Sequence, residues 1–95
     1  MLNSVNDTIF IGKKPLMTYV TSAIIQLSEL NSIKIKARGS SIGLAVDVSQ
    51  ILLRKTNIFE IADVKIGSES LESLDGKKRN VSTIEIQISK LRKKN

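Results

Sequence analysis

The chain has 95 residues, of which 41% are apolar, a size and composition typical of one domain with its own core. Its 15 Lys and Arg residues against 9 Asp and Glu give a net charge of +6, which favours polyanionic partners. Neither Cys nor His occurs, so disulfides, thiolate and Ser–His nucleophiles and most zinc sites are excluded, and we expect neither an enzyme nor a cofactor. With 3% aromatic residues and no Trp, a base-stacking platform for single strands is not expected either.

A strand, a helix and a second strand are predicted first. Residues Thr8–Gly12 form a short apolar run, long enough for one buried strand. Pro15 suits the first position of a helix, and apolar residues then recur every three or four positions to about Leu30. Isoleucines alternate with lysines over Ile33–Ala37, which predicts the second strand. Tyr19 is expected to pack in the core.

A second helix is predicted from about Ser41 to Lys55, after a flexible glycine-serine turn with hydroxyls suited to capping it. Apolar residues cover more than one side of this helix, so it needs a second surface to cover it. A homodimer interface through Leu44, Val48 and Ile51 is one such surface, and a large sheet of the same chain is the other.

The C-terminal part has the pattern of a β-hairpin. Alternating apolar residues predict strands over Ile58–Ser68 and Val81–Ser89, and Asp75-Gly76 is a signal for a two-residue turn. Residues 69–80 have little to bury, so we expect a projecting arm that is ordered weakly or only on binding. Residues 1–7 and about 91–95 are expected to be flexible.

The order strand, helix, strand, helix, strand, strand predicts a single α+β domain over residues 1–95. Right-handed crossovers place both helices on one face of a mixed four-stranded sheet, from which the hairpin protrudes. No apolar stretch approaches the roughly 20 residues of a membrane span, and the polar, acidic start lacks the pattern of a signal sequence. We therefore expect a soluble, cytoplasmic protein.

Basic residues gather in two parts of the sequence. The first set flanks the two strand-to-helix turns, which meet at one sheet edge because the strands before them are parallel. Two helix N-termini, suited to phosphate, point to the same edge. This set comprises Lys13, Lys14, Lys36 and Arg38, with the hydroxyl of Ser40. The second set, Lys77, Lys78 and Arg79, follows the hairpin turn, where a basic tip can enter a nucleic-acid groove. The alternative is that both sets are solvated surface residues.

Three segments resemble the Alba family of archaeal chromatin proteins: GKKPLM at Gly12–Met17, KARGSSIGLAVD at Lys36–Asp47 and DGKKRNVSTIEIQI at Asp75–Ile88. The resemblance extends in order from about Thr8 to Lys90. It implies a fold similar to the C-terminal domain of translation initiation factor three and a homodimeric protein. It also implies binding to double-stranded DNA, and to RNA, with little sequence preference.

The resemblance further implies roles for individual residues. Lys13 and Lys14 would contact nucleic acid at the centre of the dimer, Arg38 would also contact it, and the basic hairpin residues would contact it as well. Lys13 corresponds to the family's target of reversible acetylation, which implies an acetyltransferase and a deacetylase as partners. Ser40 stands where many members have a second arginine, and residues 53–57 lack the phenylalanine that packs dimer against dimer along DNA.

The preferred hypothesis is a chromosome-associated architectural protein that binds phosphates of double-stranded DNA as a homodimer or as a heterodimer with a paralogue. An alternative with the same chemistry is an RNA-binding protein of RNA stabilisation or processing, because both nucleic acids present phosphates. A nuclease is disfavoured by the absence of His, Cys and a carboxylate cluster. A membrane-surface protein is disfavoured because no helix pairs a basic face with Trp or Phe anchors.

Overall fold

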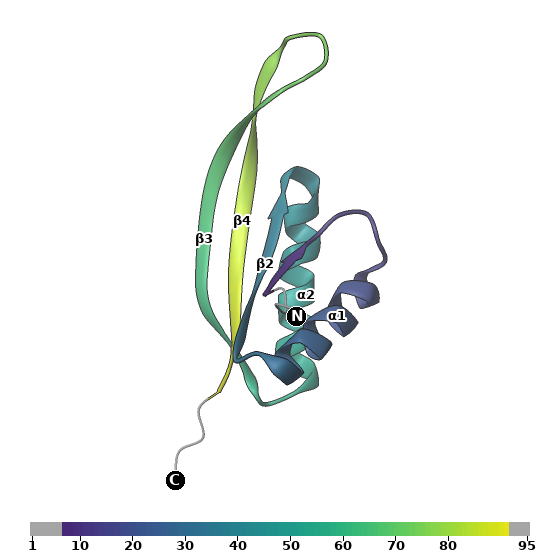
Figure 1. Cartoon of the computed structure of the whole chain (residues 1–95), viewed down its shortest axis with the longest axis vertical. Helices are drawn as coiled ribbons and strands as arrows, with labels where there is room; N and C mark the ends of the chain where they lie inside the picture. Colours follow the sequence, from purple (N-terminus) through teal and green to yellow (C-terminus); the bar gives the residue numbers. More distant parts are fainter. Residues whose placement is uncertain (1–6, 92–95) are drawn as a thin grey trace, which may run out of the picture.

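The computed structural model describes residues 7–91 and has the element order β-α-β-α-β-β (Figure 1). The elements are β1 (Thr8–Phe10), α1 (Leu16–Glu29), β2 (Ser32–Arg38), a short 3-10 helix (Gly39–Ser41), α2 (Ile42–Lys55), β3 (Phe59–Glu72) and β4 (Lys78–Lys90). The predicted α+β fold class is confirmed, and the boundaries of both helices lie within one residue of the prediction. Neither helix of the described chain is long and apolar enough to cross a membrane.

The four strands form one mixed sheet in the order β1-β2-β4-β3. β1 is parallel to β2, and the β2–β4 and β4–β3 pairs are antiparallel. Both helices lie on the same face of the sheet (Figure 1). Ile33 and Ile35 of β2 stand opposite Ile88 and Ile86 of β4, so the apolar positions of neighbouring strands point to this face together. The helices therefore cover a continuous aliphatic surface.

The core lies between this face and one stripe of each helix. Val20 and Leu27 of α1 and Leu52 of α2 are fully buried, as are Ile35 and Ile88 of the sheet. Burial of an aliphatic side chain of this size contributes about 1.5–3 kcal/mol to folding. The helices are thus held by packing against the sheet.

The core stripe of α2 includes one residue predicted for the dimer interface. Val48 is fully buried together with Ala45, Ser49 and Leu52, because these four positions recur at helical spacing on the side facing the sheet. The assignment of Val48 to the interface is therefore wrong. Ser49 is tolerated in the core because its hydroxyl donates a 2.7 Å hydrogen bond to the carbonyl of Val46.

The strands of the hairpin are longer than predicted. The ladder runs from the pair Phe59–Lys90 to the pair Glu72–Lys78, with a bulge near Ala62, so most of residues 69–80 continue the sheet. Backbone pairing requires no apolar side chains, so the polar pattern of residues 69–80 carried no signal for these outer strand segments. The predicted two-residue turn is also wrong: Ser73 N–H donates to the carbonyl of Lys77 and Gly76 N–H to that of Ser73, enclosing a three-residue loop.

The ends of the described chain are paired to the sheet. The carbonyl of Asp7 accepts a 2.7 Å hydrogen bond from Lys34 N–H, and Leu91 N–H donates at 2.7 Å to the carbonyl of Ile58. Asp7 and Leu91, both expected to be flexible, thus form backbone hydrogen bonds with neighbouring segments of the chain. The other residues expected to be flexible, 1–6 and 92–95, lie outside the described residues.

Candidate nucleic-acid interface

A buried tyrosine holds the lysine-bearing loop between β1 and α1. The backbone N–H groups of Gly12 and Lys14 both donate to Tyr19 Oη, at 2.8 and 2.9 Å. Tyr19 lies in the first turn of α1 and is 6% exposed, so its hydroxyl fixes the loop to the helix. Lys13 and Lys14 remain exposed on this fixed backbone. The sequence pattern indicated only packing for Tyr19, and its one signal was its position one helical turn after Pro15.

The turn from β2 into α2 depends on Gly39. Its φ of +57° is unfavourable for residues with a Cβ, and a Cβ there would also lie 3.3 Å from Val81 Cγ1 of β4. The glycine therefore lets the strand enter the 3-10 helix within one residue while the base of the hairpin packs against the turn. Arg38 and Ser40 stand exposed on either side of it. Ser41 is the N-cap residue of α2, but its side chain makes no capping hydrogen bond.

These two turns lie at the same end of the body, by which we mean the two helices and the part of the sheet that they cover. Because β1 and β2 are parallel, their carboxyl ends lie at the same sheet edge, and the hydrogen bond from Ile11 N–H to the carbonyl of Lys36 extends their pairing towards the turns. Figure 1 shows both turns at the end from which the hairpin projects. The structure thus places Lys13, Lys14, Arg38 and Ser40 at the end of the body from which the hairpin projects, and we call this set of residues the turn edge.

The other predicted residues lie elsewhere. Lys36 is a mid-strand residue whose side chain lies on the sheet face opposite the helices. Lys77, Lys78 and Arg79 are exposed at the far end of the hairpin, in a molecule whose longest dimension is 57 Å. Figure 1 shows this tip well beyond the body. The charged tip and the turn edge are therefore separate positive regions along one axis.

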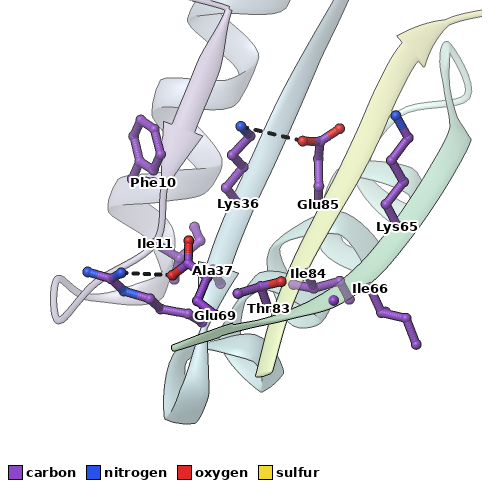
Figure 2. Close-up of a pocket in the computed structure, with 12 residues that line it drawn as sticks. Phe10, Ile11, Lys36, Ala37, Lys65, Ile66, Glu69, Thr83, Ile84 and Glu85 are labelled. Atoms are coloured by element: carbon purple, nitrogen blue, oxygen red, sulfur yellow. Dashed lines mark hydrogen bonds and ion pairs between the residues drawn. The ribbon is translucent and has the colours of Figure 1, made fainter. Parts of the chain in front are cut away.

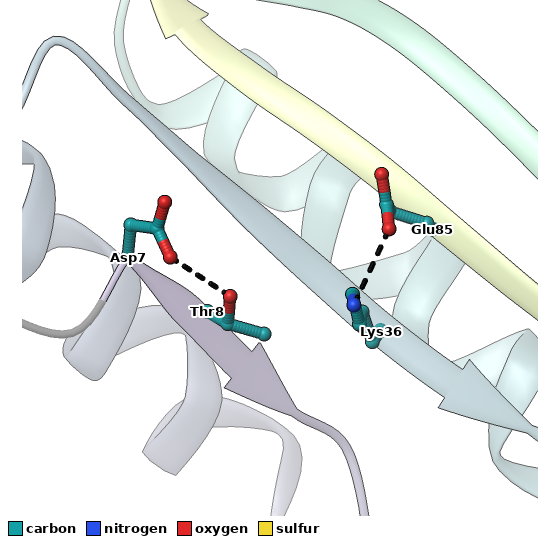
Figure 3. Close-up of polar contacts among 4 residues, drawn as sticks. All are labelled: Asp7, Thr8, Lys36 and Glu85. Carbon is teal, nitrogen blue, oxygen red and sulfur yellow. Dashed lines mark hydrogen bonds and ion pairs between the residues drawn. The ribbon is translucent and has the colours of Figure 1, made fainter.

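Two of the predicted cations are paired with carboxylates of the hairpin. Arg38 Nη1 lies 3.0 Å from Glu69 Oε1 of β3, and Lys36 Nζ lies 3.4 Å from Glu85 Oε1 of β4 (Figure 2). Figure 3 shows the second pair bridging the neighbouring strands β2 and β4. Both pairs are partly exposed, so each contributes about 0–1 kcal/mol. Finding these acids required the strand register, which the sequence pattern alone did not provide.

The hairpin tip also carries a carboxylate, that of Asp75, which accepts hydrogen bonds within the turn. The Ser73 hydroxyl donates to Asp75, Lys77 N–H donates to the same oxygen at 3.1 Å, and these hydrogen bonds lower the pKa of Asp75 below its ordinary value. Because the pKa is depressed on folding, the contribution of Asp75 to the turn is present above its ordinary pKa. It is lost as the pH falls through the lowered value. At neutral pH the tip is therefore anionic at Asp75 and cationic at the three residues after Gly76.

This arrangement supplies exposed cations on a fixed backbone for binding anions. Within residues 7–91, no group of three or more Asp, Glu, His or Cys side chains is placed to hold a metal ion. Lysine and arginine side chains on exposed turns contact phosphates without distinguishing one base from another. The geometry is thus suited to binding a polyphosphate backbone at two places along the molecule.

Comparison with known proteins agrees with this geometry. The Alba family model matches residues 7–68. A protein of Nitrosopumilus maritimus (strain SCM1) named DNA/RNA-binding protein Alba is 62% identical over 92 residues, covering 95% of this chain and 97% of that protein. The structure of Alba from Thermoplasma volcanium superposes with a TM-score of 0.80 at 40% identity, over 86% of this chain and 98% of the other. ALBA1 from Trypanosoma brucei shares the fold, with a TM-score of 0.71 at 17% identity, over 93% of this chain and 72% of the other. The family indicated by the three sequence segments is confirmed, and the chain belongs to the Alba family.

Proposed function

We propose that this protein binds DNA and RNA through their phosphates, with little sequence preference, as an architectural protein of the chromosome. The observation that carries the proposal is the turn edge, where Lys13, Lys14 and Arg38 stand exposed on backbone held by Tyr19 and Gly39. The relative with 62% identity is named a DNA/RNA-binding protein, which supports the same class of ligand. α1 contains no Lys or Arg, and those of α2, Arg54 and Lys55, lie in its last turn, so neither helix presents a basic face suited to a major groove.

The hairpin adds a second contact to the same ligand. Lys77, Lys78 and Arg79 lie at its tip, and a thin two-stranded ribbon can follow a groove of a duplex. Together with the turn edge, the tip would contact phosphates at points separated along the long axis of the molecule. This spacing favours an extended ligand such as a duplex over a small anion.

We also propose that the protein acts as a dimer, through a surface that differs from the predicted one. Ile61, Val64 and Ile66 of β3 stand opposite Ile88, Ile86 and Ile84, and therefore lie on the helix-covered face of the sheet. They nevertheless remain exposed, Ile66 to 81%, because β3 is the edge strand of the sheet and lies beyond the part that the helices cover. Val46 of α2 is exposed as well, whereas Leu44 and Ile51 are partly buried against the core.

The dimer surface is tested by charge insertion. The proposed dimer surface is the apolar patch formed by Ile61, Val64 and Ile66 of β3 with Val46 of α2. Val64→Asp should shift the protein from dimer to monomer in analytical ultracentrifugation, because a desolvated carboxylate opposes burial of the patch. Ile25→Asp, on an exposed position of α1 outside the patch, is the matched control and should leave the dimer intact. A monomeric wild-type protein, or a dimer that survives Val64→Asp, would contradict this interface.

The nucleic-acid function is tested by binding to matched duplex DNA and duplex RNA at several salt concentrations. For Lys13→Ala/Lys14→Ala, the negative slope of log affinity against log salt should become shallower by about 0.9 for each phosphate that the variant no longer neutralises. Arg54→Ala/Lys55→Ala is the matched control, because it removes the same charge from exposed residues at the opposite end of α2. Equal binding by both double variants would place the site elsewhere.

The same experiment separates chromosome architecture from RNA stabilisation or processing. Comparable affinities for the two duplexes favour the architectural role, and a marked preference for RNA favours the second. Acetylation of Lys13 would remove a charge from the turn edge, so Lys13→Gln should weaken binding to both duplexes. A specific acetyltransferase and deacetylase would then act on this exposed lysine.

A further inference from the structure

The sheet face opposite the helices carries an aromatic residue beside two lysines. The strand register aligns Phe10, Lys36, Glu85 and Lys65 in one row across β1, β2, β4 and β3. Figure 2 shows their side chains projecting from the same face of the sheet. Adjacent strands lie about 4.8 Å apart, so each side chain in the row neighbours the next. The row therefore places a planar ring at one edge, a lysine beside it, and then a carboxylate and a second lysine.

Phe10 does not contribute its ring to the core. It is 68% exposed, whereas Ile9 and Ile11 on either side of it are buried. Strand alternation explains this difference, because β1 has helices on one face only. The ring is thus available to a ligand without any rearrangement of the fold.

The row forms one wall of a groove of about 520 Å³. Arg38 also lines the groove, while Thr83 and Gly67 lie side by side in the neighbouring row. A Cβ at position 67 would lie 3.2 Å from Thr83 Oγ1, so the glycine keeps this part of the face free of side chain. The volume falls within the range of roughly 300–1,000 Å³ found for small-ligand sites.

We propose that this groove binds an unpaired nucleotide, with its base stacked on Phe10 and its phosphate beside Lys36 and Arg38. The occupant follows from the chemistry of the lining: an exposed aromatic ring stacks on the open face of a base, and the adjacent cations pair with phosphate. A paired base inside a duplex is covered on both faces by its neighbours, so it cannot stack on the ring. The low aromatic content had argued against a stacking platform, but one exposed ring beside cations is sufficient for one base.

This inference rests on the proposed nucleic-acid function and extends it to single-stranded segments. Arg38 belongs both to the turn edge and to the groove, so an unpaired nucleotide at the groove would lie next to a duplex bound at the edge. In the free protein, Lys36 and Arg38 are held by Glu85 and Glu69. A phosphate would compete with these carboxylates for the same cations.

The test compares a single-stranded pyrimidine oligonucleotide of about ten nucleotides with a blunt-ended duplex. Phe10→Ala should weaken single-strand binding roughly 5- to 150-fold, the change that corresponds to about 1–3 kcal/mol for one stacked base. Duplex binding should remain at the wild-type level. Ile25→Ala, which also shortens an exposed apolar side chain but outside the groove, should change neither affinity.

Phe10→Trp provides a second readout that does not depend on loss of binding. The chain has no other Trp, so this variant carries a single indole in the groove. Single-strand binding should be retained, and stacking of a base should quench the indole fluorescence. The blunt duplex should leave the fluorescence unchanged.

The possible results separate this proposal from the function on which it rests. Unchanged single-strand binding in Phe10→Ala, or an equal loss for both ligands, would overturn the groove assignment and leave the turn edge standing. Failure of Lys13→Ala/Lys14→Ala to weaken duplex binding would instead overturn the proposed function. If Phe10→Ala changes the sedimentation of the free protein, Phe10 contacts a second copy of the chain and the nucleotide proposal is wrong.

Discussion

The body and the hairpin arm are both regular structure, but different interactions hold them. In the body, side chains such as Leu27, Ile35 and Leu52 are fully buried between helices and sheet. Beyond Ile66 the arm has no helix against it, and nearly all its side chains are exposed, so cross-strand hydrogen bonds form most of its structure. The stability of the fold therefore resides in the body, while the arm is a charged extension that can adapt to a ligand at low energetic cost.

Two contacts join these regions at the base of the arm. Val81 packs beside Gly39, and Glu69 forms an ion pair with Arg38. Both contacts involve the turn edge, where the first phosphates are expected. The direction in which the arm leaves the body is thus linked to the state of the proposed binding site.

The largest effect should come from a cavity in the body. Ile35→Ala should lower the free energy of unfolding by about 2–5 kcal/mol, because the side chain is fully buried in the central strand β2. Leu74→Ala, at the tip of the arm, should change it by less than about 0.5 kcal/mol. Denaturant unfolding of both variants measures the contrast, and a comparable loss for Leu74→Ala would show that the tip belongs to the cooperative core.

The two glycines with positive φ provide a second, smaller comparison. Gly39→Ala should destabilise the protein by about 1–3 kcal/mol, because alanine is strained at a φ of +57° and its Cβ would crowd Val81. Gly76→Ala meets the same backbone strain at φ +85° but has open space around it. Its effect should remain local, visible as faster amide exchange in the tip with little change in global unfolding. A large global loss for Gly76→Ala would contradict the independence of the arm.

A change confined to the loop of the body should separate stability from binding. Tyr19→Phe removes the hydroxyl that accepts from Gly12 and Lys14 N–H, and should cost about 1 kcal/mol of stability. Duplex binding should weaken although no charge is removed, since the lysine-bearing loop is no longer fixed. Binding at the wild-type level, measured by fluorescence anisotropy, would show that the loop needs no fixing.

The sequence pattern predicted the body better than the arm, for a physical reason. Burial imposes a period of 3.6 on helices and 2 on strands, so α1, α2 and β2 were placed within a residue or two. The pattern could not place β3 and β4 beyond Ser68 and before Val81, because their outer part is held by backbone pairing. It also placed Phe10 in a buried run, whereas the structure exposes one face of β1. Val48 was misassigned because apolar residues on α2 cover a wider arc than the core uses.

The candidate site divides in the same way. The residues at the turn edge followed from topology, since parallel strands bring Lys13, Lys14 and Arg38 to one sheet edge. The carboxylate partners of the predicted cations did not, because Glu85 and Glu69 come from β4 and β3, and the register of these strands with β2 and with each other does not follow from sequence spacing. The role of the Tyr19 hydroxyl could not be predicted either, because it depends on how closely the loop between β1 and α1 approaches the first turn of α1. Contacts between elements therefore carried the information that sequence spacing lacked.

The smallest effect should come from the ion pair that links arm and body. Glu69→Gln removes the carboxylate held by Arg38, so the arginine no longer exchanges one anion for another when phosphate binds. Because an exposed pair is worth about 0–1 kcal/mol, duplex affinity should rise by no more than roughly fivefold. Glu60→Gln, an exposed carboxylate near the start of β3, controls for the change in net charge. A gain in duplex affinity specific to Glu69→Gln would show that Glu69 of the arm weakens phosphate binding at the turn edge through Arg38. Equal gains for both variants would assign the effect to net charge alone.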